Sequence, residues 1–310
     1  MRFSIVTTLY NTSDYLEDFM VRCQSLLPKL PIESFEYILV DDGSRVDQIE
    51  KAKSICKKFN NVFLVCLSRN FGHHPAILKG LEQSSGDLVF LIDSDLEEDP
   101  ADCLKLFDEF KTSQADVVFG YQERRRGGVL ERASGYIFYF LMRNLMKIDI
   151  SENLMTSRLM SRRYVNALLS YSESQINFSG LALLTGFRQT SIPLKKLRLR
   201  ETSYSFSKKI TLLVDAITSF SSTPLKLIFG VGFLIFSVAS TVISFLAVRL
   251  LIGGSPASGW VSLIVSIWFL GGLIMLSLGI LGIYISRIFM ETKNRPRTIV
   301  KELLVFKGEE

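Results

Sequence analysis

The chain has 310 residues, a net charge of +5 and a hydrophobic fraction of 48 %, and its mean hydropathy of +0.26 is high for a soluble protein. The charge is modest, and the basic residues cluster beside two uncharged segments near the end, which favours an anionic membrane surface over a nucleic acid as partner. Four widely spaced cysteines without a CxxC motif indicate reduced thiols of a cytoplasmic domain rather than disulfides or metal ligands.

The first 120 residues alternate between short apolar runs and amphipathic segments. Short runs rich in Val, Ile, Leu and Phe are typical of strands in a sheet that is covered on both faces. The alternation predicts an α/β domain with a mostly parallel sheet, whose ligands bind outside the carboxyl ends of the strands. We predict strands at 3–9, 36–41, 62–67, 88–93 and 116–120, and helices near 12–27, 46–59, 74–84 and 100–112.

Two of the predicted strands end in pairs of acidic residues. EYILVDDGS places Asp41 and Asp42 at the end of one strand, and LVFLIDSD places Asp93 and Asp95 at the end of another. Carboxylates that converge at one sheet edge repel one another, and a divalent cation removes that conflict. An acidic helix cap would explain one such pair. Two pairs at neighbouring strand ends instead favour a site for Mg²⁺ or Mn²⁺ and a diphosphate.

The region from 121 to 225 is less regular than the first 120 residues. Residues 121–128 are predicted to form a basic loop. Residues 130–148 are equally compatible with an amphipathic helix on the membrane and with a helix packed on the sheet. Residues 204–226 are predicted to form a juxtamembrane helix.

Two uncharged segments, 227–248 and 260–286, are each long enough to cross about 30 Å of hydrocarbon as a helix. Basic residues precede the first and follow the second, so the positive-inside rule predicts an inner-membrane hairpin with both ends in the cytoplasm. The predicted parts are a cytoplasmic α/β domain with juxtamembrane helices (1–225), a transmembrane hairpin (226–290) and a cytoplasmic basic tail (291–310). Two spans per chain are compatible with a homo-oligomer but do not require one.

Several motifs resemble those of family 2 glycosyltransferases that act on polyprenyl phosphate. This subgroup is similar to dolichol-phosphate mannose synthase and includes the bacterial undecaprenyl-phosphate sugar transferases. Together with the two predicted spans, the motifs cover nearly the whole chain. They are TLYN (8–11), YILVDDGS (37–44), LSRNFGHHPAILKGLEQSSGDLVFLIDSDLEEDP (67–100) and RLMSRR (158–163).

The resemblance implies a GT-A fold, a nucleotide-sugar donor and inversion at the anomeric carbon. It also implies that Asp93 and Asp95 are the catalytic DxD residues, which hold the donor's ribose and Mg²⁺ or Mn²⁺. A UDP-sugar is favoured because UDP is the common choice among bacterial relatives. The other donor-binding residues that the resemblance implies are Tyr10, Asn11, Asp41, Asp42, Asn70, Gly72 and Asp87.

The chain departs from the family pattern mainly in its second half. Thr156 stands where Asp is usual, Ser179 where Arg is common and Leu184 where Trp is common. In the first half, Thr8 stands at a usual Pro and Glu97 at a usual Gln. The half that would bind the acceptor is therefore the more divergent one.

A lipid phosphate fits these departures as the acceptor. Its second pKa lies near 6, so it is largely anionic at neutral pH and needs little help from a base at position 156. We therefore predict transfer of a sugar from a nucleotide sugar to polyprenyl (undecaprenyl) phosphate, for cell-envelope glycan synthesis. The predicted acceptor-phosphate residues, with basic or small polar side chains, are Arg124, Arg125, Arg126, Arg198, Arg200 and Ser203.

Two other functions stay open on the sequence alone. One is transfer to a hydroxyl of a lipid-linked saccharide, which needs a base that the acceptor half does not clearly offer. The other is a non-catalytic, membrane-anchored subunit that binds nucleotide sugars. The changes at Thr156, Ser179 and Leu184 favour this function, whereas the intact DSD and VDDGS motifs argue against it. His73 and His74 are equally compatible with donor contact and with a structural role.

Overall fold

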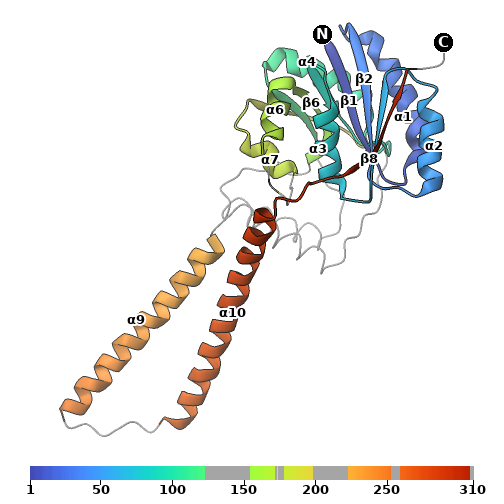
Figure 1. Ribbon diagram of the computed structural model, residues 1–310. Helices are drawn as coiled ribbons and strands as arrows, with labels where there is room; N and C mark the ends of the chain where they lie inside the picture. Colours follow the sequence, from blue (N-terminus) through green and yellow to red (C-terminus); the bar gives the residue numbers. More distant parts are fainter. Residues whose placement is uncertain (123–153, 172, 174–177, 198–222, 253–258, 308–310) are drawn as a thin grey trace. The chain divides into compact units, whose positions relative to one another are not determined.

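The computed structural model describes residues 1–122, 154–171, 173, 178–197, 223–252 and 259–307 (Figure 1). They fall into two compact units. The first holds the described residues up to 197 together with 295–307, and the second holds 223–252 and 259–294. Residues 123–128 of the predicted basic loop, the predicted helix at 130–148 and most of the predicted juxtamembrane helix lie outside the described residues. Tyr121, predicted to begin that loop, is instead the last residue of strand β5 (Val117–Tyr121).

The first unit is built on a mostly parallel sheet, as predicted. In the described part of the chain, the strand order is β7-β5-β6-β4-β1-β2-β3-β8. The central strands β4, β1, β2 and β3 run parallel, whereas β6 and β8 run antiparallel to their neighbours. The strands are β1 (Arg2–Leu9), β2 (Ser34–Asp41), β3 (Val62–Leu67), β4 (Leu88–Leu91), β5 (Val117–Tyr121), β6 (Leu154–Ser161), β7 (Gln189–Pro193) and β8 (Val300–Phe306).

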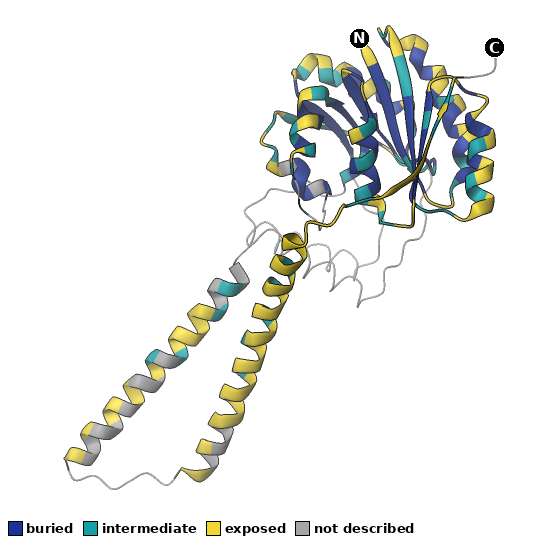
Figure 2. Ribbon diagram, in the orientation of Figure 1, coloured by how far each residue is buried: buried dark blue, intermediate teal, exposed yellow. Residues whose placement is uncertain are grey.

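Helices cover both faces of the sheet, and its central strands β1 to β4 are largely buried, whereas β7 and β8 at the two edges are more exposed (Figures 1 and 2). Successive side chains of a strand point to opposite faces, so Ile5 packs with one helical layer and Val6 with the other. One layer contains α1 (Ser13–Leu26), α2 (Val46–Cys56) and α4 (Asp102–Ser113); the other contains α3 (His73–Gln83), α6 (Arg162–Leu169) and α7 (Phe178–Leu184). A short 3-10 helix, η1 (Leu27–Lys29), follows α1.

The predicted strands and helices of the first 120 residues are confirmed to within a few residues at each end. One boundary matters for the site. The strand predicted at 88–93 ends at Leu91, and the backbone N–H of Ile92 still donates to the Val6 carbonyl oxygen at 3.1 Å. Asp93 therefore lies in the loop that leaves the sheet.

The segment after the last helix returns to the sheet. In the predicted basic tail, residues 300–306 form β8 and pair antiparallel with β3, with Leu303 opposite Val65. Leu304 and Phe306 pack against the core, and Lys53 of α2 lies 3.3 Å from Glu302. Our sequence analysis did not predict this strand, whose hydrogen-bonding partner lies more than 200 residues earlier in the chain.

The second unit contains two long helices, α9 (Thr223–Leu251) and α10 (Trp260–Thr292). Among the described residues, one stretch is long and apolar enough to cross a membrane: Ser266–Thr292, 27 residues with a hydropathy of 2.1. Its apolar side chains are exposed in this unit, as Figure 2 shows, which fits a helix surrounded by lipid. The predicted span at 227–248 lies in α9, several of whose side chains are outside the described set, and it stays a prediction.

The turn after β2 requires a glycine. Gly43 has a φ of +71°, and a Cβ there would lie 2.4 Å from the Arg69 carbonyl carbon and from the Asn70 nitrogen. Gly186 has a similar φ of +69° but has open space around it. Substitutions at the two glycines therefore distinguish the energetic cost of a side chain at positive φ, which both share, from the cost of a steric clash, which arises only at Gly43.

We expect Gly43→Ala to lower the free energy of unfolding by about 2–5 kcal/mol, because a clash with backbone is added to the cost of positive φ. Gly186→Ala should lower it by only about 1 kcal/mol, since the backbone cost is partly offset in the unfolded chain. Urea unfolding followed by far-UV circular dichroism measures both. If both variants lose the same free energy of unfolding, the backbone around Gly43 can move away from the added Cβ at little energetic cost.

Candidate active site

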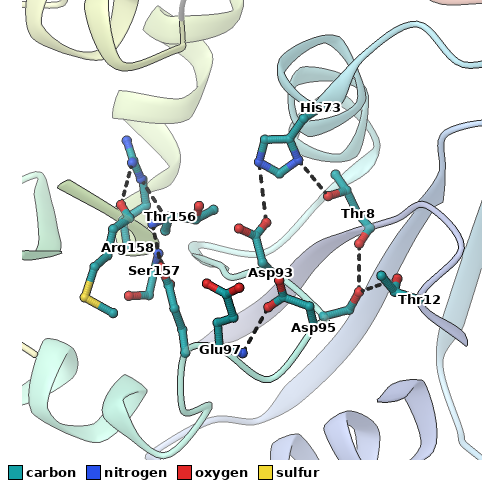
Figure 3. Close-up of polar contacts among 12 residues, drawn as sticks. Thr8, Thr12, His73, Asp93, Asp95, Glu97, Thr156, Ser157 and Arg158 are labelled. Atoms are coloured by element: carbon teal, nitrogen blue, oxygen red, sulfur yellow. Dashed lines mark hydrogen bonds and ion pairs between the residues drawn. The ribbon is translucent and has the colours of Figure 1, made fainter. Parts of the chain in front are cut away.

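The carboxyl ends of β1, β2 and β4 meet at one edge of the sheet and carry most of the predicted donor residues. Leu9 at the end of β1 pairs with Asp41 at the end of β2, and β4 runs parallel to β1 on its other side. The loop after β4 is fastened to β1, because the Ser94 hydroxyl donates to the Thr8 carbonyl oxygen at 2.9 Å and lies 3.2 Å from the Thr12 hydroxyl (Figure 3). The two acidic pairs therefore lie at the same end of the sheet. They are not on neighbouring strands as the sequence predicted, because β1 lies between β2 and β4.

Asp93 lies among polar side chains from three parts of the chain. Its Oδ1 is 3.5 Å from Nε2 of His73 (Figure 3), and the Thr156 side chain acts to lower its pKa. Burial raises the pKa of Asp93 to about 6, and the negative charge of Asp95 adds to this rise. Burial also lowers the pKa of His73, so the neutral imidazole is favoured at pH 7. The Nδ1 atom of His73 lies 3.1 Å from the Thr8 hydroxyl.

The carboxylate oxygens of Asp93 and Asp95 fit a hard divalent cation. Both residues lie in one short loop, and a cation bound there would offset the repulsion between their negative charges. Within the described ranges, no three His, Cys, Asp or Glu side chains form a group that could hold a metal. A third protein ligand is not required for Mg²⁺, which usually binds one or two carboxylates and completes its coordination with water and substrate phosphates.

Glu98 and Arg158 are site residues that the sequence analysis did not single out. Glu98 is buried and accepts hydrogen bonds from the backbone N–H groups of Thr156 (3.0 Å) and Ser157 (2.7 Å), which fastens the loop after β4 to β6. Arg158 is also buried; its guanidinium donates to the carbonyl oxygens of Met155 and Thr156 and lies 4.6 Å from the centre of the Phe178 ring. Nothing local in the sequence identifies these partners.

The turn after β2 positions the residues expected near the nucleoside. Asp41 accepts from the Ser44 N–H at 3.2 Å, and the Ser44 hydroxyl accepts from the Asn11 N–H at 2.9 Å. Asn11 has a φ of +54°, and its side-chain oxygen accepts from the Arg45 N–H at 3.0 Å. Tyr10 beside it is 53 % exposed, so its ring is available to a ligand at this edge.

Asp42 holds the loop that contains Asn70 and Gly72. Its two oxygens accept from the backbone N–H groups of Phe71 (2.7 Å) and Gly72 (2.9 Å). Gly72 has a φ of +104°, and Asn70 is exposed. Burial raises the pKa of Asp42, whereas these two hydrogen bonds lower it. Asp42 therefore shapes the site by holding the backbone of the loop after β3.

Asp87 is a correction to the predicted donor set. It precedes β4, and its Oδ2 accepts from the Arg2 N–H at 2.8 Å at the start of β1. Asp87 and Asp93 are therefore at opposite ends of the same strand, about 20 Å apart at the usual rise per residue. Ligands of such sheets bind at the carboxyl ends of the parallel strands, whereas Asp87 precedes the amino end of β4. Asp87 therefore does not belong to this site. The predicted acceptor residues Arg124, Arg125, Arg126, Arg198, Arg200 and Ser203 lie outside the described residues.

We expect Asp42→Asn to loosen the loop after β3, because an amide offers one acceptor oxygen where the carboxylate offers two. The loss of one buried hydrogen bond costs about 1–3 kcal/mol, which corresponds to about 5- to 150-fold faster exchange of the Phe71 and Gly72 amides. Hydrogen–deuterium exchange measures this directly. Asp18→Asn, which removes an exposed ion pair with Arg22 on α1, is the control and should leave that loop unchanged.

Comparisons with known proteins agree with this architecture. The family model described as "Glycosyl transferase family 2" matches residues 4–169. A crystal structure of a mycobacterial protein shares the fold, with a TM-score of 0.50 and 19 % sequence identity over 70 % of this chain and 72 % of that one.

Two relatives align along nearly the whole chain. A protein of Mycobacterium tuberculosis, named as a glycosyltransferase, is 41 % identical over 98 % of this chain and 88 % of its own length. The prophage-derived bactoprenol glucosyl transferase of Shigella flexneri is 31 % identical over 97 % of this chain and 98 % of its own length. The chain therefore belongs to glycosyl transferase family 2 and is a glycosyltransferase.

Proposed function

We propose that the enzyme transfers a sugar from a nucleotide sugar to membrane polyprenyl phosphate, with inversion at the anomeric carbon. The observation that carries this proposal is the pair of Asp93 and Asp95 in the loop after β4, at the same end of the sheet as Asp41 and Asp42. Such a pair suits a divalent cation bound to a diphosphate. The similarity to a bactoprenol glucosyl transferase along 97 % of the chain supports a polyprenyl acceptor and makes UDP-glucose the first donor to test.

The surroundings of Thr156 support a phosphate acceptor over a hydroxyl acceptor. Position 156 carries a hydroxyl in place of the usual carboxylate, and the nearby Glu98 accepts hydrogen bonds from two backbone N–H groups, so its carboxylate is engaged within the protein. A hydroxyl acceptor would need a base to remove its proton. A phosphate monoester, with a second pKa near 6, is already anionic at neutral pH.

The proposed reaction exchanges one C–O bond for another. An oxygen of the lipid phosphate attacks the anomeric carbon, and the bond from that carbon to the donor's diphosphate oxygen breaks. The electron pair leaves with the nucleoside diphosphate, and no proton has to be removed from the acceptor. Asp93 and Asp95 would hold Mg²⁺ or Mn²⁺, which would supply positive charge to the departing diphosphate. Tyr10 and Asn11 would orient the nucleoside, and the predicted arginines would hold the lipid phosphate.

The position of β8 supports a chain that crosses the membrane twice. Residues 300–306 pair with β3, so the chain ends on the same sheet on which it begins. A chain that leaves one side of a membrane and returns to it must cross an even number of times. If Ser266–Thr292 is one crossing, a second is needed, and α9 with its 29 residues is long enough to supply it. We therefore propose a cytoplasmic site, with both termini on that side.

We expect Asp95→Ala to lower kcat/KM by at least about 100-fold, because a cation that stabilises the leaving diphosphate contributes several kcal/mol. The assay uses the full chain in detergent with Mg²⁺ or Mn²⁺, undecaprenyl phosphate and labelled UDP-glucose, followed by a panel of other nucleotide sugars. Label that enters the lipid phase is counted.

Asp87→Ala is the matched control, because Asp87 lies at the opposite end of the same strand and should leave kcat/KM within about threefold. Metal-dependent transfer that is lost only in Asp95→Ala supports the proposal. A wild-type protein that binds a nucleotide sugar but labels a lipid-linked saccharide, and never the lipid phosphate, contradicts it.

We expect a thiol placed in the connector between α9 and α10 to face the outside. The four native cysteines are buried, so Ser255→Cys introduces a single accessible thiol. A membrane-impermeant maleimide should label it in intact cells. Lys29→Cys, at an exposed position of η1, is the control and should react only after the membrane is permeabilised. Labelling of Ser255→Cys only after permeabilisation rules out the hairpin.

A further inference from the structure

Glu97 and Lys196 join two loops that are 99 residues apart in the chain. The Lys196 ammonium donates to Oε2 of Glu97 at 2.8 Å, and the backbone N–H of Leu197 donates to the Glu97 carbonyl oxygen at 2.7 Å. Glu97 follows Asp95 in the loop after β4, and Lys196 follows β7. Leu194 is buried and donates its N–H to the Tyr121 carbonyl oxygen at 2.9 Å, so the chain is held on both sides of Lys196.

The Lys196 ammonium lies within the acidic end of the site. Burial lowers its pKa, but the hydrogen bond to Glu97 and the negative charges of Glu97, Glu98 and Asp95 outweigh this effect and raise it. The charge of the same ammonium also helps to lower the pKa of Asp93, the other residue of the DxD pair. Lys196 is therefore fully charged at neutral pH and faces the loop where the diphosphate is expected.

Stability alone is a weak reason for this ion pair. The side chains of Lys196 and Glu97 are 26 % and 17 % exposed, and burying two charges to this extent costs much of what their attraction returns. The two loops are already joined by the bond from the Leu197 N–H to the Glu97 carbonyl oxygen, which needs no particular side chain at either position. The usual Gln of the family at position 97 would leave the loops joined but Lys196 without its counter-charge.

We propose that Lys196 binds a phosphate group in the transfer site and that Glu97 positions its ammonium for this task. An ammonium has three N–H donors, and among the described residues only Glu97 accepts from it, which leaves two for phosphate oxygens. The transfer brings a diphosphate and a second phosphate together, and a cation beside them offsets their repulsion. This inference rests on the proposed function. The phosphate is either that of the nucleotide or that of the lipid.

The test measures the binding of each phosphate separately, without turnover. Titration calorimetry gives the Kd of UDP with Mn²⁺ and the Kd of farnesyl phosphate, a polyprenyl phosphate with a shorter chain, on the full-length protein in detergent. We expect Lys196→Met to weaken one of them by about 10- to 100-fold, the value of a hydrogen bond to a charged group. The ligand whose Kd changes identifies the source of the phosphate.

Three further variants separate phosphate binding from a structural role. Lys196→Arg should recover most of the lost affinity, because it keeps the charge. Glu97→Gln should weaken the same ligand less than Lys196→Met does. Lys53→Met is the matched control, since Lys53 is 24 % exposed and pairs with Glu302 on the far edge of the sheet, and it should change neither Kd.

The outcomes distinguish this inference from the proposed function. If Lys196→Met leaves both Kd values within twofold of the wild type, Lys196 does not bind phosphate, whatever the transfer assay gives. If only the UDP affinity falls and no transfer to lipid phosphate is found, the inference holds for the nucleotide while the proposed acceptor fails. A loss in Lys196→Met that Lys196→Arg does not recover shows that position 196 acts through structure.

Discussion

Buried carboxylates that accept hydrogen bonds from backbone N–H groups hold the functional end of the sheet together. A buried carboxylate is costly unless it accepts such bonds or meets a cation. Asp42 is satisfied by the N–H groups of Phe71 and Gly72, and Glu98 by those of Thr156 and Ser157. Each pair fixes one loop around the site. Asp93 instead lies 3.5 Å from His73, and burial raises its pKa to about 6, an effect that a bound cation would oppose.

The sheet also joins the two ends of the chain. β8 adds to the edge of β3 after the apolar helix α10, so the segment that follows the proposed membrane span is part of the first unit. An antiparallel edge strand satisfies backbone groups of β3 that would otherwise be open to other chains. This arrangement is the physical basis for proposing two crossings, because a strand cannot pair with a sheet on the other side of a bilayer.

The first 120 residues were predictable because their strands are short, mainly apolar runs and their helices carry one apolar stripe. The acidic pairs at Asp41 and Asp93 were predictable for the same reason, since each follows such a run. Asp87 was misplaced because a motif states which residues occur together and not at which end of a strand each one lies. β8 was missed because its sequence, VKELLVF, mixes charged and apolar residues, as an edge strand can.

Local periodicity and short motifs specify the α/β alternation, the mostly parallel sheet, the acidic strand ends and the family, so all four could be predicted from the amino-acid sequence. The roles of Asp42 and Glu98 in holding backbone N–H groups became visible only in the folded chain. The tertiary structure alone placed Lys196 beside Glu97, Arg158 over Phe178 and β8 beside β3. The physical reason is that these contacts join residues far apart in the chain, and no local propensity specifies a partner that only the packing of the sheet brings near.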